Sequence, residues 1–386
     1  MWWLEGSDEM REFYEFFAGG GMASLGLGKS WTCTFANDID ERKAASYRYR
    51  FGSDHFHLQD VGLLTTNDIP GHATLAWASF PCQDLSLAGN GKGLNGKRSG
   101  TFRPFWNLMQ GLQRERRAPR LIVLENVCGA ITSNNGRDFA EIAQAVAGMN
   151  YQLGAMVIDA VHFVPQSRPR LFVVIVAPDV NLPVGIMRAD PGAIWHPRNL
   201  VEAKFKLSKE AQDRWIWWNL PAPPERKTVF SDLIEEQPSG VKWNTHEETR
   251  ALLEMMSLLN RAKVRSAQKD GVLRVGTLYK RTRDGKCRAE VRFDDVAGCL
   301  RTPTGGSSRQ TIIVVRGQSV RTRLLSPREA GRLMGLPEDY ALPQSYNDAY
   351  RLAGDGLVVP AVSHLAAGIL APIADAIAFQ KDEMAA

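Results

Sequence analysis

The first half of the chain alternates short apolar runs with amphipathic stretches. The apolar runs are almost continuously hydrophobic, as expected for strands buried on both faces of a parallel sheet. They predict strands at residues 12–17, 32–38, 57–61, 73–80, 120–127, 152–161 and 170–178. The amphipathic stretches between them predict helices at residues 41–51, 103–117 and 137–149. This alternation predicts an α/β fold, in which a mostly parallel sheet has helices on both faces.

The pattern changes after Pro178. Residues from about 185 to 320 are richer in tryptophan, proline and charge, and they predict a smaller, irregular second domain. Regular structure returns with a helix start at Ser326, Pro327 and Glu329, and with an apolar helix at 358–379. We therefore expect three parts: residues 1–184, the second domain at 185–320, and a C-terminal segment, 321–386, that returns to the first domain.

Composition narrows the class of protein. The five cysteines of the 386-residue chain are an odd number without CxxC spacing, which argues against a disulfide framework or a zinc site and favours a reducing cytoplasm. The seven histidines are scattered, so no metal is expected. No apolar run approaches the roughly 18 residues of a membrane span, so no membrane partner is expected either.

Positive charge is concentrated in one segment. The net charge is only +5, but residues 261–292 contain eleven Lys or Arg residues against three acidic ones, a local excess of +8. Such a segment can bind a polyanion through counterion release, or it can be an ordinary solvated face. Charge alone leaves both interpretations open.

The glycine-rich sequence "FYEFFAGGGMASLGLG" predicts a strand, a tight turn and a helix, as in a Rossmann-like fold. This geometry places backbone N–H groups and a helix N-terminus at the carboxyl edge of the sheet. Asp38 and Asp60 end the next two strands, where they can bind a ribose and an adenine amine. An adenosyl ligand is therefore expected, and nicotinamide and S-adenosylmethionine cofactors both fit. Helix capping is the structural alternative for both aspartates.

Four reactive side chains are expected at the same edge. Cys82 follows the fourth strand, Glu125 ends the fifth, and Arg168 and Arg170 lead into the seventh. Hydride transfer does not obviously need a thiol, a carboxyl and two guanidiniums. Electrophilic methylation of a poorly nucleophilic carbon does need them.

Six segments occur in an order that resembles the motif series of the bacterial cytosine-C5 DNA methyltransferases. They are "FAGGG", "PCQ", "ENV", "QSRPR", "LRTPTGGSSRQT" and "GDGLVVPAVSHLA". The resemblance covers nearly the whole chain. It implies the S-adenosylmethionine-dependent methyltransferase fold for the first domain and a target-recognition domain at 185–320.

The resemblance also implies a mechanism. The Cys82 thiolate adds to C6 of a cytosine flipped out of duplex DNA, which makes C5 nucleophilic. Glu125 donates a proton to N3, while Arg170, with Arg168 nearby, stabilises O2. C5 then accepts a methyl group from S-adenosylmethionine. The glycine-rich, basic stretch after Cys82 is the mobile loop that closes over DNA in this family.

Further contacts follow from the same resemblance. Cofactor contacts are expected at Phe17, Ala18, Gly19, Gly21, Asp38, Ile39, Asp60, Val61, Pro81, Asp355 and Gly356. The family often has Asn followed by Ser or Ala where this chain has Asp355-Gly356. DNA contacts are expected at Gln83, Ser86, Lys92, Lys97, Arg98, Gln166, Lys280, Arg281, Arg283 and Arg309.

The sequence thus predicts a DNA (cytosine-5-)-methyltransferase. We expect a monomer, cytoplasmic and associated with the nucleoid, with double-stranded DNA as substrate and a cognate restriction endonuclease as partner. A tRNA cytosine-C5 methyltransferase with the same chemistry is the nearest alternative. An inactive, methyltransferase-like DNA-binding protein is the second alternative, although the intact Cys82 and Glu125 argue against it. A dinucleotide oxidoreductase does not account for the "PCQ" and "ENV" triplets.

Overall fold

The chain forms two compact units. The computed structural model describes residues 11–81, 101–283, 285–302 and 309–385. Unit 1 comprises Met1–Ile158, Arg170–Ala222 and Val362–Ala386, and unit 2 comprises Asp159–Pro169 and Pro223–Ala361. The units begin and end at other residues than the three parts expected from the sequence, since 185–222 belongs to unit 1 and 321–361 to unit 2. The functional role of the predicted target-recognition domain stays a prediction.

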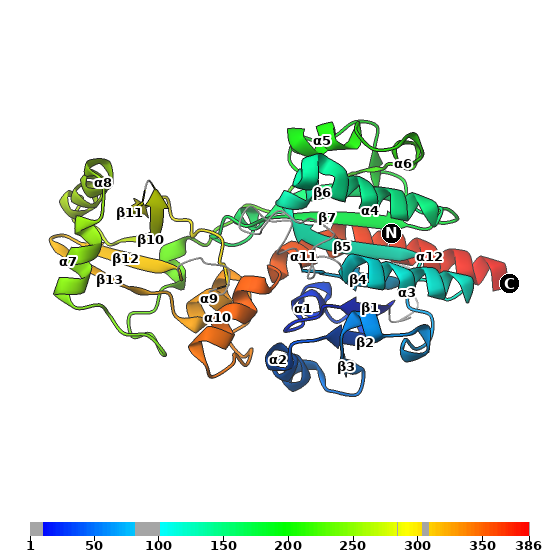
Figure 1. Ribbon diagram of the computed structural model, residues 1–386, viewed down its shortest axis with the longest axis horizontal. Helices are drawn as coiled ribbons and strands as arrows, with labels where there is room; N and C mark the ends of the chain where they lie inside the picture. Colours follow the sequence, from blue (N-terminus) through cyan, green and yellow to red (C-terminus); the bar gives the residue numbers. More distant parts are fainter. Residues whose placement is uncertain (1–10, 82–100, 284, 303–308, 386) are drawn as a thin grey trace, which may run out of the picture. The chain divides into compact units, whose positions relative to one another are not determined.

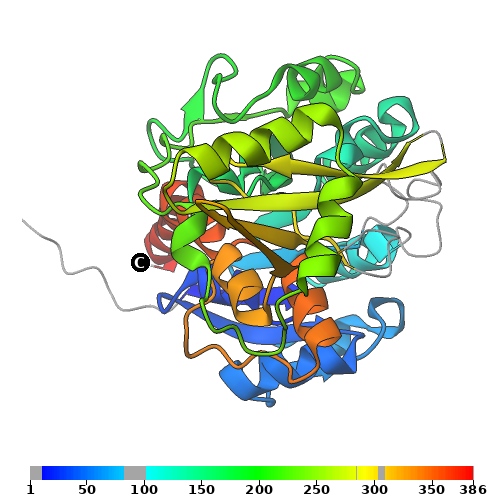
Figure 2. The same cartoon turned by 90° about the vertical axis from the view of Figure 1, so that its left-hand side faces the viewer.

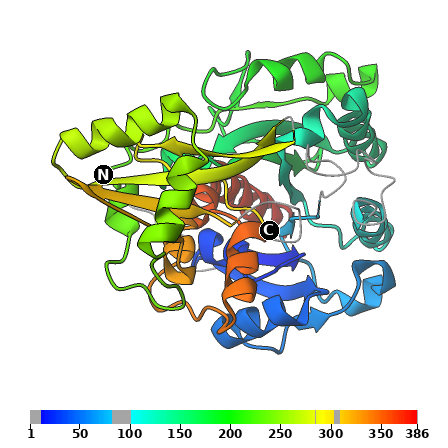
Figure 3. The ribbon, with the colours of Figure 1, turned by 60° about the vertical axis from the view of Figure 1, so that its left-hand side comes forward.

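Unit 1 is built on a seven-stranded sheet in the order β3-β2-β1-β4-β5-β7-β6 (Figures 1 and 3). Strands β1 to β5 pair in parallel with their neighbours, whereas β7 pairs antiparallel with β5. The strands are β1 (Arg11–Phe16), β2 (Trp31–Asp38), β3 (Phe56–Leu58), β4 (Leu75–Ala78), β5 (Leu121–Val127), β6 (Gln152–Asp159) and β7 (Pro169–Val176). The carboxyl ends of β1 to β5 therefore meet at one edge of the sheet.

Helices cover both faces of this sheet, as the alternation of apolar and amphipathic segments predicts. Neighbouring residues of a strand point to opposite faces. Phe35 of β2 packs on Phe16, which contacts Phe105 in α3 (Phe102–Arg114). Ala36, the next residue, belongs to a buried cluster with Tyr47 of α2 (Glu41–Phe51). Helices α2 and α3 thus lie on opposite faces.

The remaining elements of unit 1 are short, apart from two helices. The α-helices are α1 (Met22–Leu27), α4 (Arg137–Gly148), α5 (Arg198–Lys204), α6 (Lys209–Asp213) and α12 (Ala371–Ala385), which follows the π-helix η10 (Ala366–Leu370). The 3-10 helices are η1 (Val61–Leu63), η2 (Thr66–Asp68), η5 (Cys128–Ile131) and η6 (Ser133–Gly136). A two-stranded ribbon pairs β8 (Met187–Arg188) with β9 (Trp217–Trp218).

Unit 2 contains a four-stranded antiparallel sheet in the order β11-β10-β12-β13. Its strands are β10 (Arg274–Arg283), β11 (Lys286–Arg292), β12 (Thr311–Arg316) and β13 (Ser319–Leu324). Its helices are η7 (Ala160–His162), η8 (Phe230–Leu233), α7 (His246–Glu254), α8 (Leu258–Lys269), α9 (Pro327–Leu333) and α10 (Tyr346–Asp355). Helix α11 (Val359–Leu365) contains the division between the units.

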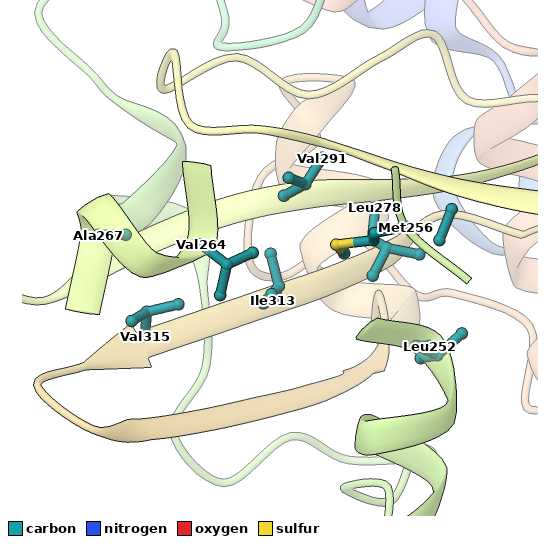
Figure 4. Packing of buried hydrophobic residues seen from close by; sticks show 9 residues of the cluster. Leu252, Met256, Val264, Ala267, Leu278, Val291, Ile313 and Val315 are labelled. Carbon is teal, nitrogen blue, oxygen red and sulfur yellow. The ribbon is translucent and has the colours of Figure 1, made fainter. Parts of the chain in front are cut away.

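Helices α7 and α8 pack on one face of the four-stranded sheet (Figure 2). Figure 4 shows the core between them, in which Leu252 of α7 and Val264 of α8 lie with Leu278, Ile313 and other buried side chains of the strands. This regular layer differs from the irregular domain that the sequence predicts. The strand pattern is obscured because β10 and β11 place arginines and lysines between their few apolar residues.

The predicted helix start at Ser326 is confirmed, and a residue of this first helical turn, Glu329, forms a buried ion pair with Arg323. Ser326 and Glu329 form a capping box with Pro327 at the first turn of α9. The Glu329 carboxylate also accepts from the Arg323 guanidinium at 2.6 and 2.7 Å, and both side chains are fully buried. Two charges held in this way stabilise the fold only while both partners are present.

Replacing Glu329 with glutamine is expected to destabilise unit 2 by about 3 kcal/mol, since Arg323 would keep an uncompensated buried charge. The measurement is urea unfolding of the full chain, followed by tryptophan fluorescence. Glu338→Gln is the matched control, because Glu338 pairs with Arg332 at the surface and an exposed pair contributes at most about 1 kcal/mol. Equal midpoints for the two variants would contradict the prediction.

One helical stretch of the described chain, Tyr346–Glu383, is long and apolar enough to cross a membrane by length and composition. More than half of its most apolar window, 56%, is buried inside the protein. Such burial is typical of a core helix, so the stretch is weak support for a membrane span.

Candidate active site

The centre of the candidate site is an ion pair between β5 and β7. The Arg170 Nε atom lies 3.2 Å from Glu125 Oε1, and the two side chains are only 17% and 11% exposed. The antiparallel register explains the contact, because Arg170 stands opposite Val127, two residues beyond Glu125 on β5. The pair thus holds a carboxyl and a guanidinium together at the carboxyl edge of the sheet.

Asn126 connects this pair to the segment that leads into Cys82. Its side-chain amide donates to the Phe80 carbonyl at 3.3 Å, two residues before Cys82. Asn126 is buried, and it belongs to the "ENV" triplet that drew attention to Glu125. Sequence reasoning missed its role, although the triplet was the available signal. Pro81 is exposed, and Cys82 itself lies outside the described residues.

The glycine turn after β1 adopts the conformation that its sequence predicts. Gly19 and Gly21 both have a positive φ, and so does Phe17, at 56°. A Cβ atom at Gly21 would lie 2.3 Å from a ring carbon of Phe51, so only glycine fits there. Ala18 is buried beneath the turn. The turn leads directly into α1, whose first N–H groups lie at the edge of the sheet.

The Asp38 carboxylate holds this turn in place through a backbone hydrogen bond. One carboxylate oxygen accepts from the Gly19 N–H at 2.7 Å, and the other accepts from the Asp40 N–H at 2.8 Å. Burial raises the pKa of Asp38, while nearby Lys43 and the two N–H donors oppose that rise. The N-cap of α2 is Asp40, so the capping alternative is wrong for Asp38. The hydrogen bonds from the Gly19 and Asp40 N–H groups fix the Asp38 carboxylate at the edge of the sheet.

The neighbouring strand end supplies complementary groups for an adenosyl ligand. Asp60 is exposed and caps η1 by accepting from the Gly62 N–H at 2.8 Å, while Val61 is buried. Ile39 is 68% exposed beside Asp38. Carboxylate acceptors for hydroxyl and amine groups, and an exposed apolar side chain for a ring, fit an adenosyl cofactor.

Glu15 is a polar core residue that sequence reasoning did not identify. Its carboxyl group accepts from the Ser24 hydroxyl and from the backbone N–H groups of Ala23 and Ser24, at the start of α1. Desolvation raises the pKa of Glu15 to about 8. Since Gly21 provides no side-chain cap, Glu15 holds the first turn of α1 against β1. No signal in "EFYEFF" distinguishes it from an outward-facing strand residue.

Arg168 and Gln166 are buried within unit 2. The Arg168 guanidinium donates to the carbonyls of Leu300, Gly354 and Gly356 at 2.8 to 3.0 Å. The Gln166 amide donates to Leu333 O and accepts from Leu300 N–H. These contacts give both side chains a structural role. The predicted contacts of Arg168 with the cytosine and of Gln166 with DNA stay predictions. Asp355 is exposed at the end of α10 in the same unit, and Gly356 follows it.

The predicted DNA contacts are divided between described and undescribed residues. Lys280 and Arg281 are exposed on β10, where Arg281 Nε lies 3.6 Å from Glu290, and Arg309 precedes β12. Gln83, Ser86, Lys92, Lys97 and Arg98, together with the Arg283 side chain, lie outside the described residues. Within the described part of the chain, no group of three or more His, Cys, Asp or Glu side chains is placed to hold a metal ion.

Comparisons with known proteins agree with this arrangement. A family model described as C-5 cytosine-specific DNA methylase matches residues 11–371. The type II methyltransferase M.BsuFI of Bacillus subtilis is 26% identical over 357 residues, covering 92% of this chain and 71% of the relative. M.HhaI of Haemophilus parahaemolyticus is 24% identical over 363 residues, covering 92% and 93%.

Solved structures show the same fold at lower identity. The Entamoeba histolytica methyltransferase EhMeth has a TM-score of 0.58 at 14% identity, covering 96% of this chain and 99% of its own. The S. pombe Dnmt2 methyltransferase has a TM-score of 0.55 at 16% identity, covering 94% and 98%. Fold and site thus define a methyltransferase. This chain belongs to the C-5 cytosine-specific DNA methylase family, whose members methylate cytosine at C5 in DNA.

Proposed function

We propose that the chain transfers the methyl group of S-adenosylmethionine to C5 of a cytosine that has been flipped out of duplex DNA. Gly19, Gly21, Asp38 and Asp60 hold the cofactor, which supplies an electrophilic methyl group when bound. The proposed enzyme works in the cytoplasm, and a restriction endonuclease of the same sequence specificity is its expected partner. Unit 2 supplies most of the target recognition.

Cys82 is the proposed nucleophile. Its thiolate forms a bond to C6 of the cytosine, and the displaced π electrons move toward N3 and O2 of the ring. Glu125 acts from its protonated form: it donates its proton to N3 and is left as a carboxylate beside Arg170. The Arg170 guanidinium stabilises charge at O2. C5 becomes nucleophilic and forms a bond to the methyl carbon, whose bond to sulfur breaks, so that S-adenosylhomocysteine is the product. Water acting as a base then removes the C5 proton, the C5–H electrons restore the C5–C6 double bond, and the C6–sulfur bond breaks to release the Cys82 thiolate. N3 returns its proton to the Glu125 carboxylate.

The Glu125–Arg170 pair is the observation that supports this proposal most directly. N3 and O2 of cytosine are both bonded to C2, so a proton donor for N3 and a cation for O2 must lie side by side. The 3.2 Å separation of these side chains meets that demand, and their burial strengthens the electrostatic interactions that stabilise the developing charge.

Methyl transfer to DNA can be tested with mixed-sequence duplex DNA and S-adenosylmethionine, read by bisulfite sequencing, with total tRNA in parallel. We expect protected cytosines within one recurring short sequence context in the DNA. Methylation confined to tRNA would keep the chemistry and overturn the substrate. Absence of methylation on both, with cofactor still bound, would leave the inactive DNA-binding alternative.

Glu125→Gln is expected to lower the single-turnover rate of methyl transfer about a hundredfold, because the amide cannot donate a full proton to N3. Glu202→Gln is the matched control, since Glu202 pairs with Arg198 on the exposed surface of α5. A Glu125→Gln rate within twofold of the control would remove Glu125 from the mechanism.

A further inference from the structure

Unit 2 contains a positively charged pocket that the catalytic proposal does not use. Its volume is about 390 Å³. The lining comes from the segment before α7, from a residue two positions before β12, from the end of β13 and from the first turn of α10. It consists of Gly240, Val241, Lys242, Asn244, Arg309, Leu324, Tyr346 and Asn347. Among the described residues, two cations and no carboxylate line the pocket, so its ligand is expected to be an anion.

Arg309 is held in place by aromatic and amide neighbours. Its guanidinium lies 5.3 Å from the centre of the Tyr346 ring and donates to the Asn347 side-chain carbonyl. Tyr346 is itself fixed, because its hydroxyl donates to Leu325 O at 3.0 Å and its ring stacks on Tyr350. The Arg309 Nε atom is buried without a hydrogen-bond partner among the described residues. A guanidinium that is held in place but not fully hydrogen-bonded is suited to receive an anion.

The rest of the lining adds positive potential. Tyr346 and Asn347 occupy the first two positions of α10, a ten-residue helix whose N-terminal N–H groups favour a negative charge. Lys242 also lines the pocket and is exposed. Asn244, two residues further along the chain, is anchored to Thr322 by two hydrogen bonds. Asp348, the acidic residue of the same helix turn, does not line the pocket.

We infer that this pocket binds a phosphodiester group of the DNA substrate, as an anchor separate from the Glu125–Arg170 centre. The inference rests on the proposed function, since it takes duplex DNA as the bound polymer. A planar guanidinium, an ammonium and a helix N-terminus are the groups that recognise phosphate oxygens, and they fix the position of DNA without reading its sequence.

The test is the salt dependence of binding to a short mixed-sequence duplex, measured by fluorescence anisotropy with the full-length protein between about 50 and 200 mM salt. Loss of one phosphate contact lowers the slope of log K against log salt by about 0.9. If the wild type and the variant bind equally at 1 M salt, this difference in slope makes the variant bind about eightfold more weakly at 0.1 M salt. We expect this change for Arg309→Gln and a change in the same direction for Lys242→Gln.

Arg198→Gln is the matched control, because Arg198 is 92% exposed on α5 of unit 1 and its loss removes the same charge. Slopes for both pocket variants equal to that of the control would overturn the inference. If Arg309→Gln fails to fold, as judged by its thermal unfolding transition, the exposed Lys242→Gln variant decides the outcome.

Two further arms separate the possible sources of phosphate and the two proposals. If Arg309→Gln abolishes binding of inorganic phosphate but leaves the DNA slope unchanged, the pocket is a site for small anions and the inference is wrong. If the wild-type protein methylates DNA but the pocket variants keep the wild-type slope of log K against log salt, only the inferred phosphate anchor is wrong. If the pocket variants show reduced slopes but the wild-type protein methylates neither DNA nor tRNA, only the proposed methyl-transfer function is wrong.

Discussion

Replacing Cys82 with alanine is expected to lower methyl transfer to DNA by about 10⁴-fold or more, while cofactor affinity stays within about twofold of wild type. Without the thiolate, C5 of cytosine is too electron-poor to attack a methyl sulfonium. The cofactor contacts proposed here come from the ends of β1, β2 and β3, so removal of the Cys82 sulfur does not disturb them. The measurements are single-turnover methylation and calorimetric titration with S-adenosylmethionine.

Cys128 provides the matched control for this prediction. It follows the "ENV" triplet, is partly buried, and has no role in the proposed mechanism. Cys128→Ala is expected to methylate at a rate near wild type. Substantial turnover by Cys82→Ala would exclude covalent catalysis, whereas equal losses in both variants would indicate general sensitivity of the fold to cysteine replacement.

Much of unit 1 could be predicted from the sequence, because buried parallel strands have an unambiguous pattern. The seven expected strands all occur, and the Asp38 and Asp60 positions follow from the rule that parallel strands end at one edge. The closeness of Glu125 and Arg170 was expected only as a shared edge. Their direct contact depends on the antiparallel insertion of β7 beside β5, and a local hydrophobic pattern contains no information on strand direction.

Arg168 shows what a motif cannot distinguish. It lies two residues before Arg170 in "QSRPR", and the sequence treats the two guanidiniums as a pair. The compact units divide between Pro169 and Arg170, and the Arg168 guanidinium is occupied by three backbone carbonyls of unit 2. The residues that accept these hydrogen bonds lie more than 130 positions away from Arg168 in the sequence, so the spacing within the motif cannot reveal the contacts.

Glu15 presents the same difficulty in the core of unit 1. A carboxyl that is fully buried at the start of α1 looks in the sequence like any polar residue of a strand. Its hydrogen bonds to the first turn of α1 appear only when the chain has folded back after the glycine turn. The raised pKa of Glu15 has a direct consequence for stability.

Replacing Glu15 with glutamine is expected to remove a loss of stability that the wild-type protein undergoes between about pH 5 and pH 8. The carboxyl titrates near 4.5 in the unfolded chain, and burial raises its pKa to about 8 in the folded protein. The folded state therefore holds the proton more tightly. The stabilisation is complete below pH 4.5 and is lost as the pH rises through 8.

At about 1.4 kcal/mol per pKa unit, the shift corresponds to about 5 kcal/mol. Glutamine keeps the shape of the protonated acid and its bond with the Ser24 hydroxyl, but it cannot ionise. Urea unfolding of the full chain from pH 5 to pH 9 should give similar midpoints for wild type and Glu15→Gln at the acid end. Above pH 8 the variant should be clearly more stable.

Glu12→Gln is the control for this series, because Glu12 lies on the same strand and is exposed. Its midpoints should follow those of the wild type at every pH, so that a change confined to Glu15→Gln reports the buried carboxyl alone. Asp38 lies close enough to raise the Glu15 pKa through charge repulsion, but it is present in all three proteins and cancels in the difference. Parallel curves for wild type and Glu15→Gln would mean that Glu15 is ionised in the folded protein, and that the first turn of α1 is held by a carboxylate instead of a neutral acid.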